Sequence, residues 1–112
     1  MTARPVAGII CCPRTVGVEP AQAVMSRYVE ATMAYGDVAA LLVPSLPGRM
    51  RAAEVAGRLD GLMLTGSPSN LDPALYGEEI GDAPGPFDAA RDGMTADLIK
   101  AMLDLGRPVF GI

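Results

Sequence analysis

The sequence contains no histidine, and this absence excludes several kinds of catalytic site. Without an imidazole, neither a Ser-His nor a Cys-His pair can form within these 112 residues. A zinc site is also disfavoured, because the two cysteines, Cys11 and Cys12, are adjacent and lack the Cys-x-x-Cys spacing of metal ligands. We therefore expect no metal and no cofactor, and any hydrolase chemistry would need residues from elsewhere.

Long apolar runs and clusters of basic residues are missing as well. No run approaches the roughly 18 residues that a membrane-spanning helix needs. The nine basic residues are scattered and the net charge is −4, so we expect neither a nucleic acid nor a membrane as partner. Adjacent cysteines point to opposite faces of a strand and are poorly placed to bridge each other. This favours a reduced, cytoplasmic setting.

What the sequence does contain is an alternation of apolar runs and amphipathic segments. A short apolar run closed by turn residues is typical of a parallel strand buried on both faces. The predicted buried strands cover residues 6–12, 37–43, 62–65 and 107–112. The predicted helices cover residues 21–35, opened by Pro20 after a loop over 13–18, then residues 50–59 and residues 88–105. This alternation predicts βαβ units, hence one α/β domain with a parallel sheet and right-handed crossovers.

The stretch 62–70, Leu-Met-Leu-Thr-Gly-Ser-Pro-Ser-Asn, joins the third predicted strand to a turn. Gly66 permits backbone angles closed to other residues, and Pro68 fixes φ and removes a donor. Open α/β sheets bind ligands at the carboxyl ends of their central strands. The N–H groups of this turn could therefore face an anion or a developing oxyanion, although an ordinary surface turn would use the same residues. The long irregular segment 70–86 that follows favours a functional loop.

Residues 60–70 and the segment 73–78, Pro-Ala-Leu-Tyr-Gly-Glu, resemble the class I glutamine amidotransferase-like hydrolases. Within that group the resemblance is to the γ-glutamyl-γ-aminobutyrate hydrolase family, peptidase family C26. Arg91 and Asp92, near the start of the long helix, and the closing run 107–112 match the same family. The resemblance covers essentially the whole chain. It implies a three-layer, flavodoxin-like α/β fold, of which this chain is the amino-terminal part of a single domain and therefore incomplete.

The resemblance also implies a reaction. In that family a strand ending in a Phe-Gly-Ile-like run is followed by a Cys-Arg-Gly nucleophile elbow, and a later His-x-Glu pair completes the triad. We therefore expect a cysteine nucleophile directly after Ile112 and a partner in the remaining carboxyl-terminal half of the same protein. The implied activity is hydrolysis of a γ-glutamyl amide bond in a small-molecule substrate.

The resemblance further implies which residues of this chain form the site. The backbone of Gly66 and Ser67 would form part of the oxyanion hole, with the Ser67 N–H beside Gly66 as one donor, and the amide directly after the nucleophile would be the other donor. Ser69, Asn70 and Tyr76 would shape the pocket for the γ-glutamyl group. For these three, the alternatives are a turn-capping hydroxyl, an Asx-turn amide and an aromatic side chain that packs the loop.

Several other residues are predicted to be structural. Glu78 and Arg91 would form a salt bridge that holds the long loop. Cys11 and Cys12 do not match the nucleophile position and are predicted to be buried, inert thiols. Two other hypotheses for the function stay open. One is a non-catalytic flavodoxin-like module that binds a small anion at the turn, and the other is an amidotransferase-like structural partner without a triad. The sequence also leaves open whether the protein forms a homo-oligomer.

Overall fold

Four parallel strands form the central sheet. In spatial order they are β4 (Ala39–Val43), β1 (Val6–Ile10), β5 (Gly61–Leu64) and β6 (Val109–Gly111). Each neighbouring pair is parallel, as the alternation of strands and helices predicted. The structure, a computed structural model, describes residues 3–69, 71, 73–77 and 85–112.

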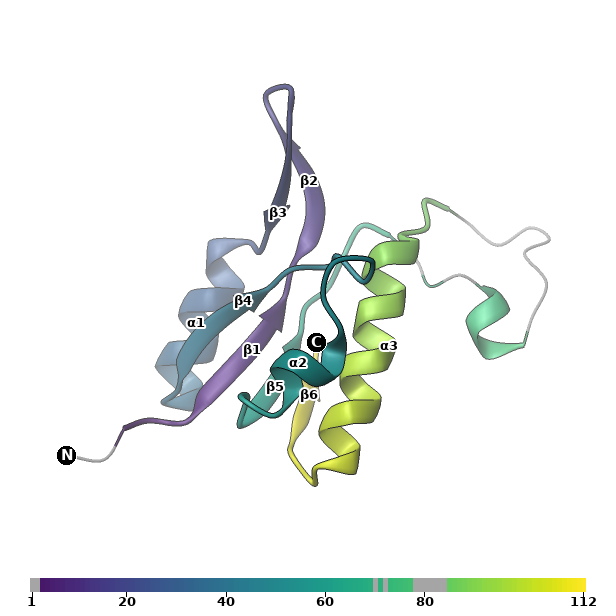
Figure 1. Cartoon of the computed structure of the whole chain (residues 1–112). Helices are drawn as coiled ribbons and strands as arrows, with labels where there is room; N and C mark the ends of the chain where they lie inside the picture. The colour runs from purple at the N-terminus through teal and green to yellow at the C-terminus, as the bar shows by residue number, and fades with distance from the viewer. Residues whose placement is uncertain (1–2, 70, 72, 78–84) are drawn as a thin grey trace.

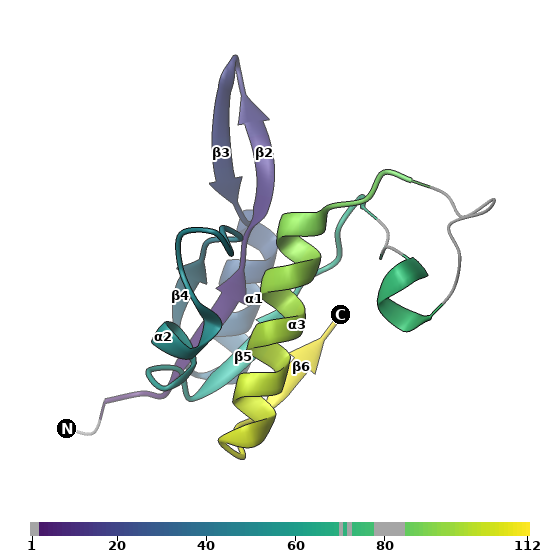
Figure 2. The ribbon, with the colours of Figure 1, turned by 45° about the vertical axis from the view of Figure 1, so that its right-hand side comes forward.

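Helices cover both faces of this sheet. One face carries α1 (Ser26–Gly36), and the other carries α2 (Ala52–Ala56) and α3 (Ala89–Asp104) (Figures 1 and 2). A short 3-10 helix, η1 (Pro73–Tyr76), lies in the segment after β5. The three-layer α/β architecture is therefore confirmed. Within the described residues, no helix combines the length and the apolar character needed to cross a membrane.

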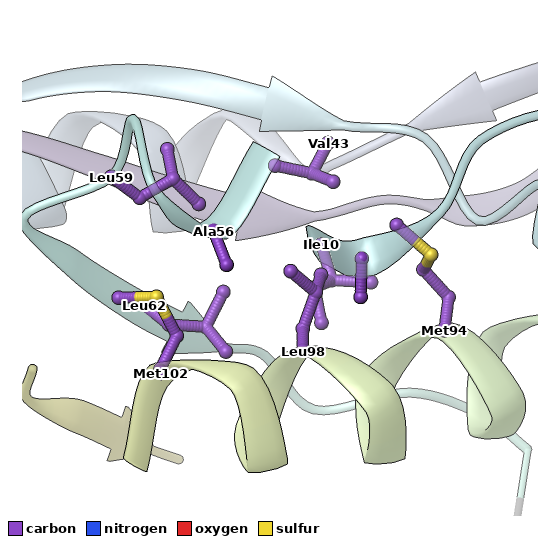
Figure 3. Packing of buried hydrophobic residues seen from close by; sticks show 9 residues of the cluster. Ile10, Val43, Ala56, Leu59, Leu62, Met94, Leu98 and Met102 are labelled. Atoms are coloured by element: carbon purple, nitrogen blue, oxygen red, sulfur yellow. The ribbon is translucent and has the colours of Figure 1, made fainter. Parts of the chain in front are cut away.

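The main hydrophobic core lies between the sheet and the layer of α2 and α3. Met94, Leu98 and Met102 recur every four residues along α3 and are almost completely buried. They pack against Ile10 and Leu62 of the sheet (Figure 3). Burial of each such side chain is worth roughly 1.5–3 kcal/mol. This stripe fixes α3 against the sheet, and the first turn of α3 reaches the segment that follows β5.

A β-hairpin occupies the region where the sequence predicted a loop and then a helix opened by Pro20. Its strands, β2 (Cys12–Val16) and β3 (Glu19–Ala23), are antiparallel and project beyond the main sheet (Figure 1). They are joined by a two-residue turn in which Gly17 has a φ of 62°. Pro20 lies within β3, where a two-stranded ribbon with open edges tolerates a residue that lacks an N–H. The prediction was wrong because a proline at the start of a helix and one in an edge strand look alike in sequence.

The predicted burial of the strands is correct at the centre of the sheet and wrong at its edges. Ile9 and Ile10 of β1 are fully buried. Leu41 and Leu42 of β4 are 53% and 49% exposed, and Phe110 of β6 is 63% exposed. β4 and β6 are the edge strands of this sheet, so each has a neighbouring strand on one side. The apolar pattern alone does not distinguish an edge strand from a central one.

An apolar groove of about 470 Å³ lies between α1 and the sheet. Its walls include Tyr28, Thr32 and Tyr35 of α1, Met63 of β5 and Phe110 of β6. Apolar side chains recur at helical spacing along α1 and form a stripe on one side of the helix. The stripe does face the sheet and Thr32 is buried, but the layer is not closely packed there.

Candidate functional site

The turn after β5 lies at the carboxyl edge of the sheet, beside the end of β6. Leu64 is paired with Gly111, and the N–H of Ile112 donates to the carbonyl oxygen of Leu64 at 3.0 Å. Gly66 and Ile112 therefore lie at the same edge of two neighbouring parallel strands. This is the edge at which open α/β sheets bind ligands.

Two backbone donors in this turn are available. Among the described residues, the N–H groups of Gly66 and Ser67 have no hydrogen-bond acceptor. Gly66 is exposed, and a Cβ atom at this position would lie only 3.1 Å from the hydroxyl oxygen of Tyr28. A glycine thus leaves space between the turn and the Tyr28 hydroxyl. Two consecutive unpaired N–H groups are what an anion or an oxyanion requires.

The hydroxyl of Ser67 stabilises the turn from within. Its Oγ accepts a hydrogen bond from the N–H of Ser69 at 3.2 Å and lies 2.9 Å from the Ser69 Oγ. The thiol of Cys12, at the start of the hairpin, also donates to Ser67 Oγ, at 3.8 Å. Ser69 therefore makes contacts within the turn, as expected for a turn-capping residue. Its contact with substrate stays a prediction. Asn70 lies outside the described residues, and the pocket role of Tyr76, the last residue of η1, stays a prediction.

Arg91 contacts the turn that follows β5. The residue is 9% exposed, and Nη2 donates to the carbonyl oxygen of Thr65 at 2.7 Å. Asp88, at the N-cap of α3, accepts a hydrogen bond from the N–H of Arg91 at 3.0 Å and fixes the first turn of that helix. The predicted partner of Arg91, Glu78, lies outside the described residues. Sequence reasoning missed the contact with Thr65 because no spacing rule relates residues so far apart.

The two cysteines are buried, as predicted. Burial, and to a smaller degree the neighbouring Cys12, raises the pKa of the Cys11 thiol. A raised pKa disfavours the thiolate, which is the form in which a cysteine acts as a nucleophile. The contact between Cys12 and Ser67 could not be read from the sequence. In the described part of the chain, no group of three potential ligand side chains is arranged to hold a metal ion.

Comparisons with known proteins identify a family and relatives of this chain. Residues 5–112 match the model of the family described as Peptidase C26. A gamma-glutamyl-gamma-aminobutyrate hydrolase of Escherichia coli O157:H7 is 34% identical over 108 residues, which are 96% of this chain and 42% of that protein. The gamma-glutamyl-gamma-aminobutyrate hydrolase PuuD of Escherichia coli K12 is 33% identical over the same shares. A putative glutamine amidotransferase of Mycobacterium tuberculosis, Rv2859c, is 34% identical over 93 residues, 83% of this chain and 30% of that protein. The chain thus spans less than half the length of these relatives.

Proposed function

Because this chain belongs to the Peptidase C26 family, we propose that the native polypeptide containing it is a cysteine-dependent hydrolase of γ-glutamyl amides. Relatives named gamma-glutamyl-gamma-aminobutyrate hydrolase match 96% of the chain and support this substrate class. The nucleophile is a cysteine directly after Ile112. The histidine that activates it belongs to the carboxyl-terminal half of the same polypeptide.

In this proposal the thiolate sulfur attacks the carbonyl carbon of the γ-amide. A C–S bond forms, and the π electron pair moves to the carbonyl oxygen, which becomes an oxyanion. Collapse of this species expels the amine, which takes a proton from the histidine, and leaves a γ-glutamyl thioester. Water then hydrolyses the thioester to glutamate and restores the thiol. The N–H groups of Gly66 and Ser67 stabilise the oxyanion in both steps.

One observation supports this role most strongly. The N–H groups of Gly66 and Ser67 are unpaired among the described residues and lie at the edge of the sheet where β6 also ends. A nucleophile immediately after Ile112 would be delivered to that same edge. Oxyanion donors act only when they are within hydrogen-bond distance of the oxygen that becomes charged.

The proposal predicts that replacing Ser67 with proline removes one oxyanion donor. We expect kcat for γ-glutamyl-γ-aminobutyrate in the native polypeptide to fall roughly 100-fold or more, as for other oxyanion donors. Release of γ-aminobutyrate, measured by chromatography, gives the rate.

Ser67→Ala is the matched control, because it removes the hydroxyl and its contacts but keeps the N–H. We expect Ser67→Ala to lose much less activity than Ser67→Pro. Equal losses of activity in the two variants would mean that the hydroxyl, and not the N–H, is responsible. That result would contradict the oxyanion role. A wild-type polypeptide that releases no amine would contradict the proposed activity itself.

A further inference from the structure

A buried arginine contacts the backbone directly before the two unpaired N–H groups. Arg91 is 9% exposed, and within the described residues its guanidinium has no carboxylate partner. Its Nε atom is buried without a hydrogen-bond acceptor, whereas Nη2 donates to the carbonyl oxygen of Thr65. Burying a cation is costly unless it is paired or hydrogen-bonded, so the contact with Thr65 is important for this guanidinium.

The geometry of the peptide group gives this contact a consequence for the turn. The peptide bond between Thr65 and Gly66 is planar and trans, so the Thr65 carbonyl and the Gly66 N–H point in opposite directions. When Arg91 holds the carbonyl oxygen toward α3, the Gly66 N–H is directed away from α3. The position of the guanidinium therefore determines which way the first donor of the turn faces.

The next peptide group is held in the same manner. The hydroxyl of Thr65 donates to the carbonyl oxygen of Gly66 at 3.1 Å. The Ser67 N–H belongs to this second peptide group and points opposite to that oxygen. Two consecutive N–H groups are thus oriented through the carbonyl oxygens of their peptide groups, and neither has an acceptor within the described residues.

We propose that Arg91 is a positioning residue that orients and strengthens the Gly66 N–H as an oxyanion donor; this rests on the proposed function. A hydrogen bond from a cation to a carbonyl oxygen is stronger than one from a neutral donor. It polarises the peptide group, and hydrogen bonds in such a chain reinforce one another. The benefit is largest when the bound oxygen carries a negative charge, so Arg91 acts on the transition state more than on bound substrate.

The test compares variants of Arg91 in the native polypeptide with γ-glutamyl-γ-aminobutyrate as substrate. We expect Arg91→Met to lower kcat roughly 10- to 100-fold, with KM changed less than threefold, because a donor is misoriented and not removed. Arg91→Lys keeps a cation that can donate to Thr65 and should recover part of kcat. This second variant also keeps the inference testable should Arg91→Met fail to fold.

Arg107 provides the matched control. Its Nη1 donates to the carbonyl oxygens of Ala56, Gly57 and Leu59, so it also holds backbone carbonyls, but it precedes β6 and lies away from the turn. We expect Arg107→Met to lower the free energy of unfolding and to leave kcat per active site unchanged. A merely structural role for Arg91 would give the same pattern as Arg107→Met and would overturn the inference.

A spectroscopic measurement separates this inference from the proposed activity. In a ¹H–¹⁵N spectrum, the Gly66 resonance should move upfield in Arg91→Met, because the polarising contact to the Thr65 carbonyl is lost. If the wild type hydrolyses the substrate but Arg91→Met keeps kcat within twofold, the inference is wrong and the hydrolase stands. If the wild type is inactive on γ-glutamyl amides, the hydrolase and the inference both fail, whatever the resonance does.

Discussion

Cys11 and Cys12 are neighbours in sequence but have different surroundings. The carbonyl of Cys11 accepts a hydrogen bond from the buried Ser45 hydroxyl, and its thiol is enclosed by the core. Cys12 begins the hairpin and donates to Ser67 in the turn. One thiol therefore belongs to the interior, and the other contacts the turn of the candidate site.

The raised pKa of Cys11 predicts a loss of stability at alkaline pH. In the unfolded chain the thiol ionises near its ordinary pKa of 9.0, whereas burial keeps it protonated in the fold. The folded state then binds more protons than the unfolded state, so the free energy of unfolding falls as pH rises above 9. Urea unfolding between pH 7.5 and 10 should show this decline, and Cys11→Ala should show a smaller one. An identical decline in both proteins would assign the effect to other groups.

At the level of single residues, the candidate site could be predicted only in part from the sequence. The Gly66–Ser67 turn could be identified because turn residues directly follow an apolar strand. The contacts of Cys12 and Arg91 with this turn, and the nearby Tyr28 hydroxyl, could not, because each of these residues comes from a distant part of the chain. A contact that depends on how helices pack on the sheet has no local signal in the sequence.

At the scale of elements, α3 was the best predicted segment. It runs from Ala89 to Asp104, against a prediction of residues 88–105. Asp88 caps its start, and Gly106, with a φ of 68°, ends it in the left-handed conformation that favours glycine. The hairpin was missed because its single strong signal, Gly17 at the turn, lies between two strands that each contain a proline.

The cap of α3 should be measurable as stability. Asp88→Ala removes the acceptor for the Arg91 N–H and is expected to cost about 1 kcal/mol of unfolding free energy. Asp88→Asn keeps an acceptor oxygen and should cost less. Chemical denaturation gives the free energies, and hydrogen exchange at the Arg91 N–H should accelerate in Asp88→Ala. Exchange that is unchanged there would mean that Asp88 does not hold the start of the helix.

On the scale of the whole molecule, helices cover the two faces of the sheet unequally in the described residues. The α2–α3 face carries a close-packed core, whereas the α1 face contains the apolar groove of about 470 Å³. The groove extends to Phe110 and Ile112, which are 63% and 68% exposed. An apolar surface of this kind in an isolated chain is a site for dye binding and for association.

Residues 1–112 produced alone should therefore bind an apolar dye such as ANS and hydrolyse no γ-glutamyl amide. Hydrolysis is expected to be absent because these residues include no histidine and both cysteines are buried. Tyr35→Ser, at the groove, should weaken dye binding. Val18→Ser, on the hairpin turn and equally exposed at 92%, should not. Fluorescence titration and the amine-release assay measure the two properties. Amine release by residues 1–112 alone would mean that the nucleophile lies within them. Equal dye binding by both variants would mean that the groove is not the apolar surface that the dye recognises.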